Sequence, residues 1–167
     1  MLARGIHRNA KRRGATAVES ALVLGIFFVL LFGVFEYCRF LMVLHLTNNA
    51  ARDASRFASV NVANEDMTTD PNVGKQAIID YARARMGGTH GNVKDFAVDV
   101  YPCTAEGLAQ SPPQAVPKPG NPPWNSASFT ERIAVTITGR YEPVTPFLLV
   151  LPESIPIRIT AIAGSEG

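Results

Sequence analysis

The pattern of apolar and polar residues divides the chain into two unlike parts. An almost unbroken apolar segment runs from Ala15 to Phe35 and holds a single charged residue, Glu19. Its 21 residues are enough for a helix that crosses the hydrocarbon core of a bilayer, which takes about 20 residues. A charge at the centre of such a segment costs roughly 2.5–3.5 kcal/mol. Glu19 is therefore a candidate functional residue.

The helical pattern continues beyond the apolar segment in a different form. From Phe40 to Ala58, small and apolar residues recur at steps of three and four, which predicts an amphipathic helix. No proline or glycine interrupts residues 34–60, so we expect one helix from Ala15 to Val60. Its second half needs a partner that covers the apolar face. The alanines that would let this partner approach closely are Ala50, Ala51, Ala54 and Ala58.

The rest of the chain contains the alternation that is typical of half-buried strands. Residues 92–101, 130–141 and 155–163 alternate apolar and polar side chains, which predicts three strands. The pair Asp70-Pro71 signals the start of a short helix. The expected fold is therefore α+β, with a small antiparallel sheet packed on the second half of the long helix.

Two stretches between these elements break the pattern. Residues 102–125 hold seven of the twelve prolines and cannot join the interior of a sheet, which predicts an exposed loop or excursion. Trp124 at its end either anchors the loop to the core, which we favour, or faces a partner. The apolar run Phe147 to Leu151 is too short to span a membrane. It either folds under the sheet, which we favour, or contacts lipid or a neighbouring subunit.

Charge is distributed unevenly along the chain. Five basic residues and no acidic residue precede Gly14. Such a cluster holds the N-terminus in the cytoplasm and places the rest of the chain outside it. The remaining residues carry eleven basic and fourteen acidic side chains, so the folded part lacks the basic excess that nucleic acid requires. We expect a membrane protein with no nucleic-acid partner.

No catalytic or metal-binding pattern accompanies this organisation. The three histidines, His7, His45 and His90, have no second ligand at metal spacing. Neither a phosphate-binding glycine loop nor a nucleophile motif occurs, so we expect no enzyme activity, no cofactor and no metal. An oxidising compartment outside the cytoplasm would permit a disulfide between Cys38 and Cys103. Nothing in the sequence brings them together, so two separate thiols are the favoured interpretation.

The junction between the basic leader and the apolar segment is the most informative motif. A secretory signal peptide is cleaved after its apolar region, whereas the small residue Gly14 precedes the region here. Cleavage between Gly14 and Ala15 would remove residues 1–14 and make Glu19 the fifth residue of the product. In a stack of helices this carboxylate could pair with the new α-amine of a neighbour. The alternative is an uncleaved anchor, with Glu19 near the head groups and favoured by the N-terminal end of its own helix.

Small residues share one face of the apolar segment, at intervals of four and eight. Small side chains at such spacing let a second helix approach closely in lipid. The alternative is that alanine and glycine are simply common in membrane helices. The candidate packing residues are Ala17, Ala21, Gly25 and Gly33.

Charged residues beyond the apolar segment are spaced to pair along the helix. Glu36 and Arg39 are three residues apart at the expected membrane exit, with Tyr37 at the level of the head groups. Asp53 and Arg56 have the same spacing. These last two residues indicate a solvated face rather than a site.

These residues resemble those of a known family. A glycine followed by an apolar helix with glutamate at its fifth position resembles a type IV prepilin, and the wider pattern resembles TadE-like proteins of tight-adherence (Flp/Tad) pilus systems. The resemblance is carried by RRGATAVESALVL, FGVFEYCRF and NNAARDASRFA, and it extends weakly into the β part. Ser20 departs from the family, in which an aromatic residue often follows the glutamate.

The resemblance implies a minor pilin or pseudopilin that acts in pilus assembly or adhesion. It implies cleavage by a prepilin peptidase between Gly14 and Ala15, with Glu19 needed for processing or assembly. The implied partners are membrane lipid, the peptidase, and other pilins or TadE- or TadF-like pseudopilins that bind through the N-terminal helix.

The resemblance also implies a location and a division of the chain. The protein would cross the bacterial inner membrane once, with a transmembrane and assembly helix of residues 15–36. An extracytoplasmic domain of residues 37–167, with the helix continuation 37–60, would lie outside and could enter a pilus. The competing hypothesis is a stably anchored binding module, in which the loop around Trp124 binds a ligand and the helix is only a tether.

Overall fold

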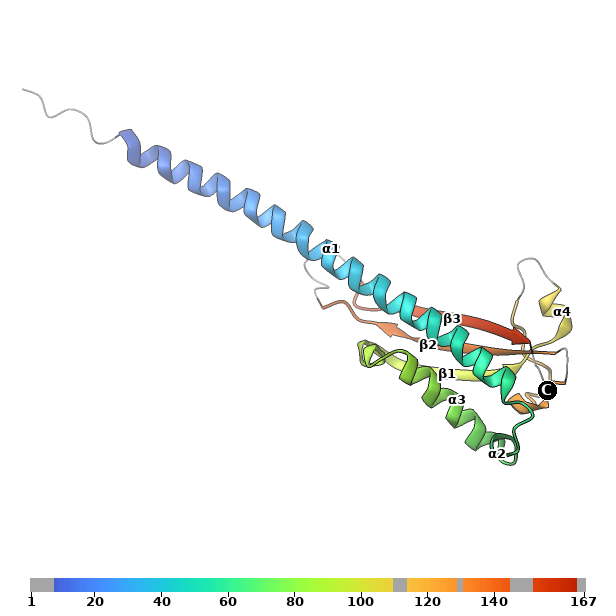
Figure 1. Cartoon of the computed structure of the whole chain (residues 1–167). Coiled ribbons are helices and arrows are strands. Elements are labelled where there is room, and N and C mark those ends of the chain that lie inside the picture. Colours follow the sequence, from blue (N-terminus) through green and yellow to red (C-terminus); the bar gives the residue numbers. More distant parts are fainter. Residues whose placement is uncertain (1–7, 110–113, 129–130, 145–151, 165–167) are drawn as a thin grey trace, which may run out of the picture.

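In a computed structural model, one long helix projects from a small α+β domain (Figure 1). The structure describes residues 8–109, 114–128, 131–144 and 152–164. The predicted fold class, a long N-terminal helix on a small antiparallel sheet, is confirmed. The elements in chain order are α1 (Arg8–Val60), α2 (Glu65–Thr68), α3 (Pro71–Arg85), the 3-10 turn η1 (Thr89–Asn92), β1 (Val93–Pro102), α4 (Ala105–Leu108), the 3-10 turn η2 (Trp124–Ser126), β2 (Arg132–Tyr141) and β3 (Ile155–Gly164).

Helix α1 ends where the sequence predicted but begins earlier. It runs for 53 residues, which corresponds to a length of about 80 Å. Its start at Arg8 lies seven residues before the predicted start at Ala15, so the predicted start of the helix is wrong. Alanine, lysine and arginine are strong helix formers. A single glycine, Gly14, does not stop a helix that continues on both sides.

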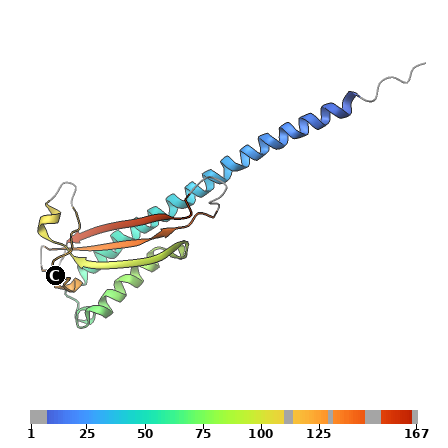
Figure 2. The ribbon, with the colours of Figure 1, turned by 180° about the vertical axis from the view of Figure 1, so that it is seen from behind.

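The sheet is built from the three predicted strands, in the order β1-β2-β3 and antiparallel throughout. β2 and β3 pair over all ten residues without a shift. The pairing of β1 with β2 is interrupted by a bulge between Lys94 and Ala97, where Asp95 has a left-handed backbone with φ of 52°. One face of the sheet is covered by α1 over β2 and β3 and by α3 next to β1 (Figure 2).

The core lies between α1 and the sheet. Every alanine of the predicted packing face is fully buried, and the facing side chains of β2 are at most 1% exposed. Because alanine has no side chain beyond Cβ, the backbone of α1 can lie close to the strands. The predicted partner for the amphipathic half of the helix is therefore the sheet. The residues concerned are Ala50, Ala51, Ala54, Ala58, Ile133, Val135 and Ile137.

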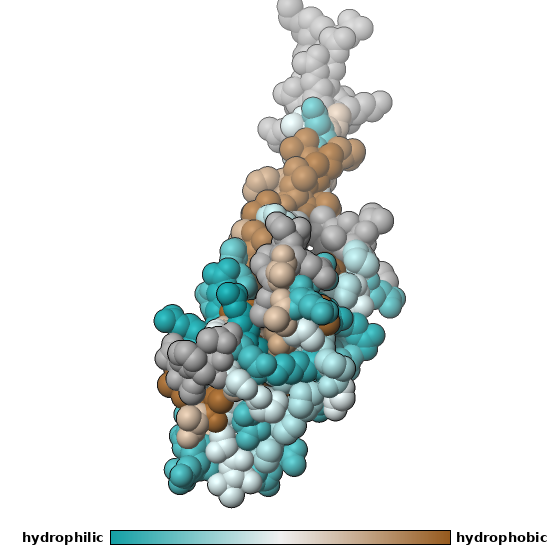
Figure 3. Space-filling model, turned by 90° about the vertical axis from the view of Figure 1, so that its right-hand side faces the viewer, coloured by the Kyte–Doolittle hydropathy of each residue, from teal (hydrophilic) through white to brown (hydrophobic). Residues whose placement is uncertain are grey.

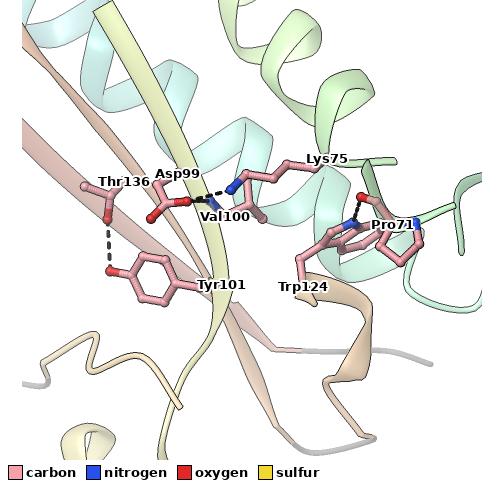
Figure 4. Close-up of polar contacts among 7 residues, drawn as sticks. All are labelled: Pro71, Lys75, Asp99, Val100, Tyr101, Trp124 and Thr136. Atoms are coloured by element: carbon pink, nitrogen blue, oxygen red, sulfur yellow. Dashed lines mark hydrogen bonds and ion pairs between the residues drawn. The ribbon is translucent and has the colours of Figure 1, made fainter. Parts of the chain in front are cut away.

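Trp124 anchors the proline-rich loop to the domain, as favoured from the sequence. Its side chain is 2% exposed, and its Nε1 donates a hydrogen bond to the backbone oxygen of Pro71 at 3.0 Å (Figure 4). Pro71 follows the helix cap Asp70, so the loop is fixed to the first turn of α3. Nearby, Lys75 of α3 pairs with Asp99 of β1 at 2.8 Å.

The second face of the sheet is partly covered by the same loop. Tyr101 of β1 is 7% exposed, and its hydroxyl group and that of Thr136 are 3.0 Å apart (Figure 4). Cys103 forms an isolated bridge with Pro117, so part of the proline-rich stretch returns to the sheet. Two prolines of the loop, 112 and 113, and the apolar run Phe147 to Leu151 lie outside the described residues.

Candidate membrane and assembly helix

The first half of α1 carries its apolar side chains outside the domain. Every residue from Gly14 to Leu30 is exposed, and Leu22 and Phe27 are 64% and 54% accessible. Figure 3 shows the apolar residues gathered on the projecting helix, above a domain surface that is mostly polar. Among the described residues, α1 is the one helix long and apolar enough to cross a membrane, and its apolar window is not buried. This arrangement fits a single-pass membrane protein.

The residues of the predicted processing site lie on this exposed part. Gly14, Ala15 and Glu19 are all exposed, and a Cβ on Gly14 would meet no atom within 4 Å. The bond between Gly14 and Ala15 lies inside α1 rather than at its start. The processing role of these three residues stays a prediction.

The face of small residues also has little contact within the chain. Ala17, Ala21 and Gly25 are exposed, and a Cβ on Gly25 would meet no atom within 4 Å. Gly33 is half-buried where the helix reaches the domain. Space for a second helix is therefore present along Ala17 to Gly25, and packing there remains a prediction.

The strongest polar contact of α1 lies at the membrane exit and was not predicted in full. Glu36 is 7% exposed. The hydroxyl group of Tyr141, at the end of β2, donates to Glu36 Oε1 at 2.5 Å, and the backbone N–H of Val144 donates to Oε2 at 3.3 Å. A buried carboxylate is costly unless it is hydrogen-bonded, and these two donors serve both oxygens. Tyr141 lies 105 residues away, so helical spacing gave no signal for this contact.

Arg39 joins the same contact from the next turn of the helix. The predicted pair with Glu36 is confirmed, with Nη1 3.6 Å from Oε1. The guanidinium carbon also lies 5.4 Å from the centre of the Tyr141 ring, and Nη2 donates to Asn92 Oδ1 at 3.1 Å. Phe40 packs edge-on against the Tyr141 ring, with 5.4 Å between ring centres. The helix is thus fixed to the domain directly after its apolar segment.

The environment of Tyr141 keeps its hydroxyl group a donor. Burial, as the larger cause, and the hydrogen bond to Glu36 together raise the pKa of Tyr141 to about 12, against a lowering by Arg39. Burial disfavours the charged phenolate, and the neighbouring carboxylate disfavours it as well. Tyr141 therefore stays protonated across the physiological pH range.

A small apolar cavity adjoins this contact. Its volume is about 290 Å³, and it lies where the exposed apolar half of α1 meets the ends of β2 and β3. It continues the apolar surface of the helix into the domain, and its lining by the described residues is mostly apolar. Its lining residues are Gly33, Glu36, Tyr37, Phe40, Tyr141, Pro143 and Ile155.

The second predicted ion pair of α1 differs from the observed one. Asp53 Oδ2 lies 3.4 Å from Nε of Arg85 on α3, so the prediction of a pair between Asp53 and Arg56 is wrong. Tyr81 of α3 stacks on Phe57 nearby, with 4.4 Å between ring centres. The sequence pattern of α1 alone could not show that α3 brings a cation to this position.

No site for a metal ion is found among the described residues, where no group of three histidine, cysteine or acidic side chains gathers. Both cysteines are free thiols: Cys38 is exposed on α1 and Cys103 is buried. Burial raises the pKa of the Cys103 thiol, which lowers its reactivity. The favoured interpretation of two separate thiols is confirmed.

A match to a known protein family covers much of α1. Residues 14–56 match the family model of TadE-like proteins. The matched residues begin at Gly14 and end at Arg56, so they include Glu19, Glu36 and Arg39. We call residues 14–56 the TadE-like segment. The match confirms the resemblance to TadE-like proteins over this segment. No curated protein and no solved structure matches the chain.

The TadE-like segment connects the protein with the Tad pilus system. It comprises the whole exposed apolar half of α1 and most of the half that packs on the sheet. The three strands lie beyond the match. The family is associated with pili and is not known for enzymes.

Proposed function

We propose that the protein is a minor pilin or pseudopilin of a tight-adherence pilus, processed by a prepilin peptidase and acting in pilus assembly or adhesion. The observation that carries this proposal is a TadE-like segment whose apolar half is exposed along its length. In the membrane, this surface contacts lipid. In an assembly, the same surface packs against the helices of other pilins or TadE- or TadF-like pseudopilins.

Processing would act on the bond between Gly14 and Ala15. The product keeps the apolar helix and gains an α-amine at Ala15, one helical turn before Glu19. In a stack of subunits the carboxylate of Glu19 pairs with the α-amine of a neighbour, so that two charges that are costly alone in lipid compensate each other. Because the bond lies inside α1, the first turns of the helix unwind before cleavage.

The remaining residues would form an extracytoplasmic domain. The basic leader holds the N-terminus in the cytoplasm of the bacterial inner membrane, the helix of residues 15–36 crosses it, and residues 37–167 lie outside. The major pilins of the systems that the chain resembles are very short. A domain of this size therefore favours a minor or tip component over the main subunit of the filament.

The mass of the protein in cells tests the proposal. In a strain with an active prepilin peptidase, intact mass spectrometry of the membrane fraction should give a chain that begins at Ala15. A strain without the peptidase, and the variant Gly14→Val, should both give a chain that begins at Met1. A chain that begins at Met1 in the wild-type strain would overturn the proposal.

The same strains separate assembly from simple anchoring. The variant Glu19→Gln keeps the size of the side chain and removes its charge, so it should reduce the number of pili per cell severely, whereas the neighbouring variant Ser20→Ala should leave it unchanged. A tether would tolerate Glu19→Gln. In the competing binding-module hypothesis the loop around Trp124 binds a ligand, and the burial of Trp124 removes this side chain from the surface that such a ligand would contact.

A further inference from the structure

Strand β3 forms an edge of the sheet and has few features that would prevent another strand from pairing with it. It pairs with β2 on one side, and α1 is the other element that it contacts extensively among the described residues. Natural edge strands avoid pairing through charges, proline or bulges. The opposite edge strand, β1, has a bulge. In β3, Pro156 and Arg158 protect only the first residues, whereas Ile159 to Gly164 contain no charge and no proline and pair with β2 without a bulge.

A polar cleft of about 550 Å³ lies on the side of α1 and reaches this unprotected half of β3 at Ile162. The side chain of Ile162 packs on the face of the sheet away from α1, with Tyr101 and Ala134. Since Ile162 also lines the cleft, the cleft reaches β3 at its edge. Figures 1 and 2 both show β3 running alongside α1. The lining residues are Asn49, Arg52, Asp53, Ser55, Arg56 and Ile162.

Two arginines of α1 line the cleft with their charges uncompensated. Arg52 and Arg56 are exposed and have no hydrogen bond or ion pair from their side chains to any described residue, while Asp53 pairs with Arg85. Residues four apart on a helix are about 6 Å apart along its axis. Alternate residues of a strand are about 6.6 Å apart. The two arginines therefore match carboxylates at alternate positions of a strand beside β3.

We propose that this cleft receives an extended acidic segment of another protein, which adds a strand to the edge of β3. Main-chain hydrogen bonds to β3 hold the segment, and acidic side chains at alternate positions pair with Arg52 and Arg56. The proposal uses the half of the TadE-like segment outside the membrane, so it does not depend on processing at Gly14.

A second copy of this chain fits the cleft less well. β3 contains no acidic residue, and the two aspartates of β1, Asp95 and Asp99, already pair with Arg140 and Lys75. Antiparallel pairing of two β3 strands would also turn the apolar halves of the two α1 helices in opposite directions, because each α1 runs alongside its β3. Two apolar helices that leave a shared sheet in opposite directions cannot both enter the same membrane.

Peptide binding to the full chain in phosphatidylcholine nanodiscs tests the proposal. The probe is a fluorescent peptide of sequence TVEVEVT, measured by anisotropy against a TVKVKVT peptide of the same length. The acidic peptide should bind more tightly, and added salt should weaken it. The double variant Arg52→Glu with Arg56→Glu should lose about tenfold or more in affinity for the acidic peptide and should gain affinity for the lysine peptide.

Two controls make the result specific. The variant Arg83→Glu changes one exposed charge on α3, away from the cleft, and should leave binding unchanged. An acidic peptide with alternate backbone nitrogens methylated should not bind, because it cannot pair with a strand. Equal binding of both charged peptides, binding of the methylated peptide, no binding of the acidic peptide, or self-association of the chain through β3 would each overturn the proposal.

Discussion

The contact between Glu36 and Tyr141 connects the membrane half of α1 to the domain through one buried carboxylate. We predict that Tyr141→Phe lowers the free energy of unfolding by about 1.5–3 kcal/mol, because the hydroxyl group bonds a charged acceptor. Denaturant unfolding of the full chain in mild detergent measures the change. Tyr101→Phe is the matched control: its hydroxyl group bonds the neutral Thr136, so it should cost about 0.5–1.5 kcal/mol. Equal losses would contradict the prediction.

Tyr141 should also make the free energy of unfolding depend on pH. The pKa of Tyr141 is raised from 10.0 to about 12 in the folded protein, so folding favours the protonated phenol. The stability that this preference contributes is fully present below pH 10 and is lost as the pH rises through about 12. The difference in unfolding free energy between wild type and Tyr141→Phe should therefore shrink across this interval. Unfolding curves at several alkaline pH values measure it, and a constant difference would contradict the assignment.

At the scale of elements, α3 packs closely against Met67 and Trp124 at a single glycine, Gly74. Gly74 is buried, and a Cβ there would clash with the backbone oxygen of Met67 and lie 2.7 Å from Trp124 Cζ2. We predict that Gly74→Ala destabilises the protein by about 1–3 kcal/mol through overpacking, although alanine is intrinsically the better helix former. Asn72→Ala, an exposed change in the same helix, should be neutral or slightly stabilising. Thermal unfolding compares the two variants, and a stabilised Gly74→Ala would contradict the close approach.

Most elements could be predicted because their signals are local. Alternation along residues 130–141 reflects which side chains of β2 point inward, and the alanines of α1 reflect how closely the sheet approaches. The partners of Glu36 and Asp53 could not be predicted, because Tyr141 and Arg85 reach them only through the fold. The start of α1 lies before the predicted one, because a change from basic to apolar composition does not by itself end a helix.

At the scale of the whole molecule, the position of Glu36 determines how the two halves meet. The apolar segment of α1 ends at Phe35, directly before a carboxylate, Glu36, that is buried by the domain rather than hydrated. The domain therefore begins where the apolar segment ends, with no free linker on α1 between them. A protein built in this way transmits the orientation of its membrane helix directly to the sheet and to the cleft beside β3.

The native cysteines report the orientation of the molecule in the membrane. Cys38 is exposed directly after the apolar segment, whereas Cys103 is buried. We predict that a membrane-impermeant maleimide labels Cys38 on intact spheroplasts, and that Cys103→Ser leaves this labelling unchanged while Cys38→Ser abolishes it. A second reporter, Ser126→Cys in the Cys38→Ser background, places a thiol on the exposed surface of the domain and should restore labelling. If both reporters reacted only after lysis, the domain would lie in the cytoplasm, and the proposed topology would be wrong.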